Sequence, residues 1–232
     1  MVCLALFVKR QFSLEEPLLQ LSTLKNRAFC ASALIVTLIN AACLVTNTLL
    51  PLLVQTVFGA SAFETGMVML PAAAVGIVLS PLAGMVFDRF GARVISLVGL
   101  ALMTASLFAL SQASTTMPLL FVALFCTLQA TGQVLANMPV NTWGINALSN
   151  DMIAHGNAIA NTGRQVAGGL ATALIMTVMT SVTSSQAALG ASAATAMGVG
   201  TGYLVCSAIG LVSLIVCFVM VRPLSGASKE EK

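Results

Sequence analysis

Six long apolar runs constrain what this chain can fold into more than any other feature of its sequence. A helix needs roughly 20 predominantly apolar residues to cross the hydrocarbon core of a bilayer. A membrane β-barrel would instead need alternating apolar and polar residues, and Leu211–Val221 shows no such alternation. The sequence therefore predicts an all-α integral membrane protein with six transmembrane helices. The predicted spans are Ala28–Val57, Thr65–Phe87, Val94–Ser111, Pro118–Leu148, Ala160–Ser181 and Met197–Val221.

Composition supports this fold class and excludes several others. Of the 232 residues, 58% are hydrophobic and 7% are charged, and the mean hydropathy is +1.00. Because soluble domains carry roughly 25% charged residues, a soluble domain, a disordered chain and a nucleic-acid-binding protein are excluded. One histidine and no CxxC pair leave no zinc site, and no cofactor is expected. The cysteines are interpreted as small core residues: Cys3, Cys30, Cys43, Cys126, Cys206 and Cys217.

The positions of lysine and arginine predict the orientation of the spans. The loops around Ala60, Ser114 and Gln186 contain no basic residue, whereas the other connections, both ends and the start of the fifth span contain all ten. By the positive-inside rule, both ends of the six-span unit are expected to be cytoplasmic. The ten residues are Lys9, Arg10, Lys25, Arg27, Arg89, Arg93, Arg164, Arg222, Lys229 and Lys232.

Three regions are expected along the chain: residues 1–27, a six-helix bundle over 28–221, and a cytoplasmic tail over 222–232. The first region is interpreted as the end of a truncated helix plus a cytoplasmic linker. Met1–Val8 is apolar but too short to span, and Lys9 and Arg10 follow it, whereas a signal peptide begins with its basic residues. An alternative is a genuine start with a short interfacial anchor.

The connection between the second and third spans carries the most specific motif, G-x-x-x-D-R-x-G-x-R. Gly84 is expected to let a neighbouring helix approach closely, and Gly91 to take a positive φ in a tight turn. Asp88 lies near the positive end of the next helix, and Arg89 and Arg93 can pair with carboxylates or carbonyls of another helix bundle. This loop is predicted to be a conformational gate, although a tight turn obeying the positive-inside rule also explains its arginines.

This motif resembles the cytoplasmic loop signature of the major facilitator superfamily, which occurs between the second and third helices of each six-helix half. Two further segments, over residues 17–29 and 157–169, together with Gly66–Pro71, resemble the fourteen-span drug:proton antiporter branch of that superfamily. The resemblance covers nearly the whole chain, but only as the C-terminal half of such a transporter. It implies a multi-pass protein of a bacterial plasma or inner membrane.

Uncharged polar residues form a stripe along the first and the fourth spans. In lipid, such side chains must face protein or water, because unsatisfied amides are costly there. They line a translocation cavity or, alternatively, form hydrogen bonds between helices. Trp143 is interpreted either as part of the cavity or as an interfacial anchor. The cavity-lining candidates are Asn40 and Asn47 on the first span, and Gln129, Gln133, Asn137 and Asn141 on the fourth.

Ionisable residues are absent from the middle of every predicted span, although proton coupling is expected at such groups. The coupling carboxylate of an antiporter would then lie in the N-terminal half. Arg164 is a gate candidate at the start of the fifth span, pairing with Asp151 or with a carboxylate of the other half; alternatively it is one more positive-inside residue. His155 is expected to be a solvated loop residue.

Small residues on the second span form a ridge, Gly76, Ser80 and Gly84, that is typical of close helix contacts and lets helices slide. The expected function is secondary active transport by one half of a proton-coupled exporter of lipophilic drugs, working by alternating access. Its partners would be a small-molecule substrate, the proton, the bilayer, and the other six-helix half or a second copy. The alternative is a non-transporting remnant or assembly subunit. An enzyme is excluded, because the sequence contains no nucleophile–base pair or metal cluster.

Overall fold

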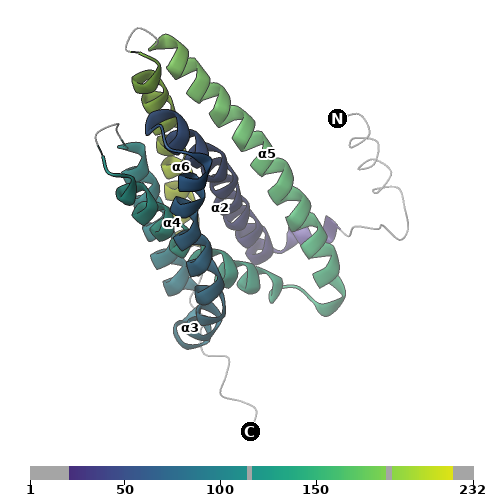
Figure 1. Cartoon of the computed structure of the whole chain (residues 1–232). Coiled ribbons are helices and arrows are strands. Elements are labelled where there is room, and N and C mark those ends of the chain that lie inside the picture. Colours follow the sequence, from purple (N-terminus) through teal and green to yellow (C-terminus); the bar gives the residue numbers. More distant parts are fainter. Residues whose placement is uncertain (1–20, 114–116, 187–189, 222–232) are drawn as a thin grey trace.

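The computed structural model describes residues 21–113, 117–186 and 190–221, and it is all-helical over these ranges. Six of its helical segments are long and apolar enough to cross a membrane, so the predicted fold class is confirmed. Figure 1 shows them as one elongated bundle. The elements are a 3-10 turn over Leu21–Lys25, α2 (Arg27–Leu52) with a π-helical end over Leu53–Val57, α3 (Ala62–Ser111), α4 (Leu119–Ile145), a 3-10 turn over Asn150–Met152, α5 (Ile153–Ser185) and α6 (Ala191–Met220).

Helix α3 contains two spans, Ala62–Phe87 and Gly91–Ser111, joined at a sharp break. Gly91 has φ 77° and ψ 162°, a conformation that L side chains rarely adopt, so the prediction of a positive φ here is confirmed. The helix begins with a capping box: the Ser61 hydroxyl accepts from the Glu64 amide, and the Ser61 amide donates to the Glu64 carboxylate. A one-residue break at Gly91 thus reverses the chain between adjacent spans.

The fifth and sixth helices begin earlier than the sequence predicted. Helix α5 begins at Ile153 rather than Ala160, and α6 begins at Ala191 rather than Met197. His155 therefore lies in a helix, and the prediction that it lies in a loop is wrong. The added turns are rich in alanine, which favours helix, but they are not apolar enough to extend a membrane-spanning run.

The buried core is centred on α2 and on the second half of α3. Ile35, Ile39 and Leu49 of α2 and Leu100 and Met103 of α3 are fully buried. Helix α2 packs against α4, α5 and α6, while α3 packs against α4 and α6. The helices that carry the predicted cavity stripes, α2 and α4, are therefore direct neighbours.

Helices α3 and α4 approach each other closely at Gly99 and Gly132. A Cβ atom added to Gly132 would lie 2.5 Å from the Gly99 carbonyl oxygen, so the two backbones touch. The ridge that the sequence singled out makes no such contact, because a Cβ at Gly76 would meet nothing within 4 Å and one at Gly84 would meet only the Met138 side chain at 3.6 Å. The expectation of a close helix approach at Gly84 is therefore wrong for the described chain.

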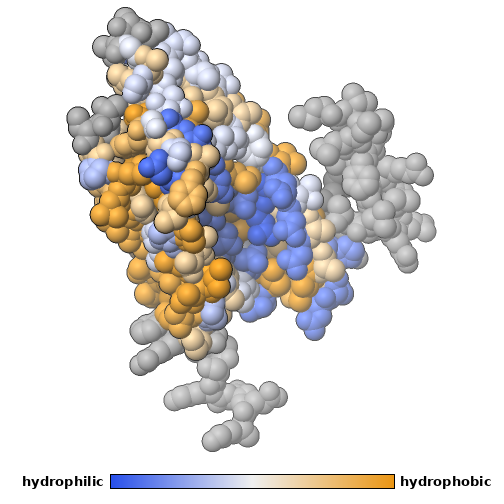
Figure 2. All heavy atoms as spheres, in the orientation of Figure 1, coloured by the Kyte–Doolittle hydropathy of each residue, from blue (hydrophilic) through white to orange (hydrophobic). Residues whose placement is uncertain are grey.

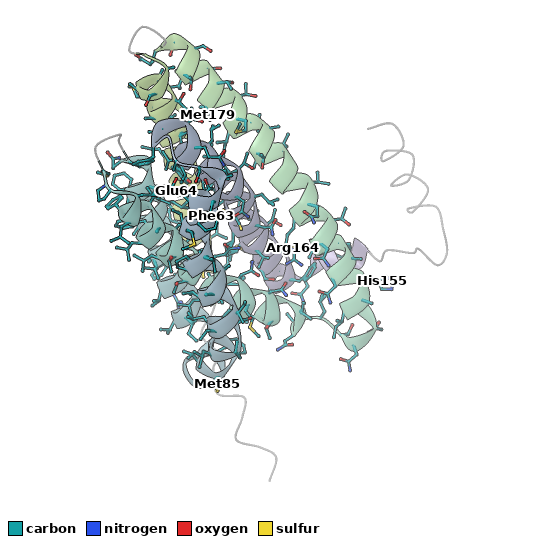
Figure 3. The ribbon with its side chains drawn as sticks, viewed as in Figure 1. Phe63, Glu64, Met85, His155, Arg164 and Met179 are labelled. Atoms are coloured by element: carbon teal, nitrogen blue, oxygen red, sulfur yellow. The ribbon has the colours of Figure 1, made fainter. Side chains whose placement is uncertain are left out.

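Several segments that lie next to basic residues in the sequence come together at one end of the bundle. The Asn26 side-chain amide, before α2, donates to the Ala147 carbonyl, after α4, at 2.6 Å. Arg93, just after the break in α3, donates to the Phe218 carbonyl near the end of α6 at 3.0 Å. Met85, shortly before the break in α3, lies at this end of the bundle, and Phe63 and Glu64, at the start of α3, lie toward the opposite end (Figure 3). The start of α2, the end of α4, the break in α3 and the end of α6 therefore lie at the same end of the bundle.

Candidate functional site

The two polar stripes meet at Cys43 of α2. The Asn47 side-chain amide on the same helix donates to the Cys43 sulfur at 3.7 Å, and Gln133 of α4 is joined to Cys43 by a side-chain hydrogen bond. We call Cys43, Asn47 and Gln133 the amide–thiol cluster. Because its members come from two helices, it brings together residues from both predicted stripes.

Cys43 is a polar link rather than one of the buried core residues that the sequence predicted. Cys126, Cys206 and Cys217 are buried as expected, whereas Cys30 and Cys43 are partly exposed, and Cys3 lies outside the described residues. Cys43 follows Asn40 by three residues and precedes Asn47 by four. This helical spacing places Cys43 on the face that carries the amides, and it is the signal that could have identified the thiol.

Two amides near the cluster have polar atoms without partners. Gln129, one turn before Gln133, is 4% exposed, and its Nε2 donor has no hydrogen-bond partner. The Asn40 Oδ1 acceptor, one turn before Cys43, is also buried and unpaired. A buried polar group left unsatisfied costs about 1–3 kcal/mol, so a donor on α4 and an acceptor on α2, the latter close to Gly168 of α5, remain without hydrogen bonds in the described residues.

The remaining amides of α4 extend its stripe away from the cluster: Asn137 and Asn141 are both half-buried. Within the cluster itself, Asn47 is exposed on α2. Many hydroxyls of the spans behave differently: Thr127, for example, donates to the Ala123 carbonyl of its own helix at 2.7 Å. Figure 2 shows hydrophilic residues between α3 and α5 on the face in view, beside a largely hydrophobic surface over α3.

Within the predicted gate motif, the structure describes the surroundings of Gly84, Gly91 and Arg93. The side chains of Asp88 and Arg89 lie outside those that the structure describes. Arg93 is half-buried, and its guanidinium lies 5.1 Å from the centre of the Phe218 ring while donating to the Phe218 carbonyl. The sequence assigned the partners of this arginine to another bundle, but the observed partner is α6 of the same bundle.

Arg164 lies about three turns into α5 rather than at its start, because the helix begins at Ile153. Its Nε donates to the Ala160 carbonyl at 3.3 Å, and its Nη2 donates to the Asn161 side-chain oxygen at 2.6 Å. Neither partner is Asp151, which lies in the 3-10 turn before the helix. Figure 3 shows Arg164 beyond His155 along α5, on the part of the helix that lies beside α2.

These features define a multi-pass membrane protein with polar side chains on two neighbouring helices. Comparison with known proteins gives its family: residues 5–172 match the model of the Major Facilitator Superfamily. The chain belongs to this superfamily of membrane transporters, and it is not an enzyme.

Individual relatives agree with this assignment. The chain is 32% identical over 229 residues to the uncharacterized transporter YcnB of Bacillus subtilis, covering 99% of this chain and 48% of YcnB. It is 32% identical over 206 residues to the lincomycin resistance protein LmrB of Listeria monocytogenes, covering 89% of this chain and 42% of LmrB. A multidrug resistance protein B homolog of Mycobacterium tuberculosis is 28% identical over 170 residues, which cover 72% of this chain and 31% of the homolog. The chain spans about half the length of these relatives or less.

Proposed function

We propose that the chain is the C-terminal half of a fourteen-span, proton-coupled exporter of lipophilic small molecules. The observation that carries the proposal is the meeting of the two amide stripes at Cys43, next to an unpaired donor on Gln129 and an unpaired acceptor on Asn40. Two of the relatives named above carry drug-resistance names, one for lincomycin and one for multiple drugs. Their substrates motivate the choice of test compounds for this chain.

The cavity wall is formed by α2 and α4 in this proposal. A buried amide donor and a buried amide acceptor suit an uncharged polar substituent on an otherwise apolar substrate, because each can replace its missing hydrogen bond with one to the ligand. Neither group selects one compound strongly, which fits a broad range of lipophilic substrates. Asn137 and Asn141 extend the wall toward the end of the bundle that carries Arg27 and Arg93.

The other six-helix half is the proposed partner across the cavity. A transporter of this kind places its substrate between two repeats, and this chain supplies one. The second span supports this assignment, since Gly66 and Gly76 face open space and Phe63 and Ile77 are each 77% exposed. Both ends of the unit are proposed to be cytoplasmic, so the break at Gly91 and the Arg93–Phe218 contact form a cytoplasmic gate. The proton-coupling carboxylate is assigned to the other half, because Glu64, Asp88 and Asp151 all lie at the ends of spans.

Efflux in a bacterial host that lacks its own multidrug exporters tests this function. The chain is produced alone, and together with the N-terminal half of YcnB, and cells are assayed for accumulation of lincomycin and of a lipophilic fluorescent cation. We expect low accumulation only when both halves are present, with export abolished by an uncoupler that collapses the proton gradient. High accumulation in every arm, with both proteins in the membrane, would instead favour a non-transporting remnant.

The amide–thiol cluster is tested in the same cells with Gln133→Leu. We expect export to fall about ten-fold, the factor that corresponds to about 1.4 kcal/mol of lost substrate interaction. Thr127→Val on the same helix is the matched control, because its hydroxyl bonds its own backbone and it should leave export unchanged. Equal export by the Gln133 variant and the control would remove the cluster from the cavity wall.

A further inference from the structure

A concavity of about 420 Å³ lies at the end of the bundle that carries Arg27 and Arg93. It is separate from the amide–thiol cluster and is formed where the start of α2, the last turns of α4 and the end of α6 come together. Its lining combines one guanidinium group, one indole ring and aliphatic side chains: Arg27, Ala28, Trp143, Val219 and Met220.

Arg27 is the charged group of this concavity. It is the first residue of α2 and is exposed, and no hydrogen bond or ion pair joins its guanidinium to another described residue. The cap of the helix is supplied separately, because the Asn26 side-chain oxygen accepts from the amides of Ala28 and Phe29. The described carboxylates of Glu64 and Asp151 do not line the concavity. Among the described residues no carboxylate competes for this guanidinium, whose planar donors suit a bidentate contact with a phosphate.

The apolar part of the concavity continues onto a hydrophobic stripe of α6. Val219 is 71% exposed, and Ile215, one turn earlier, and Phe218, the preceding residue, each have more than half of their surface exposed. Trp143 is half-buried beside Arg27, an arrangement typical of indoles at the boundary between hydrocarbon and headgroups. The site therefore has a positive pole at its mouth and an apolar track that leads along a membrane-spanning helix.

We propose that this concavity binds an anionic phospholipid of the cytoplasmic leaflet. Arg27 contacts the headgroup phosphate, Trp143 packs against the glycerol region, and the acyl chains follow the α6 stripe. Basic pockets between helices at the cytoplasmic surface favour anionic lipids, because the headgroup charge adds to the burial of the acyl chains. The assignment to this leaflet rests on the proposed orientation, whereas the lipid preference itself does not depend on transport.

The chain offers a direct probe, because Trp143 is its single tryptophan. The complete chain is reconstituted in phosphatidylcholine vesicles that contain a small fraction of brominated phosphatidylglycerol or of brominated phosphatidylcholine, and quenching of Trp143 fluorescence is measured. We expect about five-fold higher apparent affinity for phosphatidylglycerol, the factor for one basic residue near an anionic lipid. Arg27→Gln should make the two lipids equal, and Arg27→Lys should restore part of the preference.

Lys25→Gln is the matched control, because Lys25 is an exposed basic residue two positions away that does not line the concavity. It should retain the preference for phosphatidylglycerol. Equal quenching by both lipids in the unmodified chain would overturn the proposal, as would a preference that survives Arg27→Gln. Loss of the preference for phosphatidylglycerol on adding inorganic phosphate would identify a simple anion site. A preference that appears only after removal of residues 222–232 would identify the tail as the occupant of the concavity. Either result also overturns the proposal.

Discussion

The two spans of α3 have nearly the same hydropathy but opposite environments in the chain. Ala62–Phe87 leaves Phe63, Ile77 and Met85 largely exposed, whereas Gly91–Ser111 buries Leu100 and Met103 completely. In water this difference would be costly, but lipid solvates an exposed apolar side chain as well as a protein core does. Hydropathy therefore decides that both segments enter the membrane, and close packing decides which of them becomes part of the core.

Glycine makes the same contrast at the level of single residues. Gly99 and Gly132 allow backbone contact between the third and fourth spans, while Gly66 and Gly76 of the second span face open space. A small residue on a membrane helix thus allows helix–helix contact at one position, whereas at another position no neighbouring helix packs against it. Substitutions that add the same methyl group at both kinds of position test this contrast most directly.

The largest effect is expected from Gly132→Ala compared with Gly76→Ala. The added Cβ at Gly132 would lie 2.5 Å from backbone atoms of the neighbouring helix, so the helices must separate, at a cost of about 1–3 kcal/mol. At Gly76 the methyl meets nothing, and the better helix propensity of alanine should leave stability equal or higher by up to about 1 kcal/mol. Thermal unfolding in detergent, followed by circular dichroism, measures both; equal midpoints would contradict the packing contrast.

A smaller loss is expected where the two spans join. Gly91→Ala forces a side chain onto a residue with φ 77°, at a cost of about 1–3 kcal/mol if the turn persists. Part of this strain can be relieved, because a Cβ atom added at Gly91 would meet no side chain or backbone of another segment within 4 Å. Gly84→Ala is the control in the same motif, since its Cβ would lie at ordinary contact distance from Met138. A variant at Gly91 as stable as the one at Gly84 would show that the break does not need its left-handed glycine.

The smallest effect concerns the contact between the third span and the end of α6. Arg93→Gln keeps a donor but loses the charge over the Phe218 ring, an interaction of about 0.5–1 kcal/mol at a partly exposed site. The end of α6 should then open more often, and Cys217, which is fully buried nearby, should react faster with a maleimide. The measurement uses a variant whose other cysteines are replaced by serine or alanine. An unchanged labelling rate would mean that Arg93 does not hold the two helices together.

Sequence reasoning predicted the candidate site in part. It found the residues of both amide stripes, because helical periodicity groups Asn40 with Asn47 and Gln129 with Gln133. It did not find Cys43 as their link, because a cysteine in an apolar run has the same composition signal as any small core residue. It placed Arg164 at the start of its helix, because the polar turns before it have no membrane-spanning hydropathy.

Local properties of the chain determined its six spans, the alternation of its basic residues and the turn at Gly91. Each depends on the transfer of one segment into lipid or on the conformational freedom of one residue, and both can be read from neighbouring residues. Only the tertiary structure decided that Gly99 meets Gly132, that Cys43 joins two helices, and that Arg27 and Trp143 share a concavity. These contacts join surfaces far apart in the sequence, and their shape complementarity has no signal in hydropathy, because the bilayer is as apolar as the surfaces that pack within it.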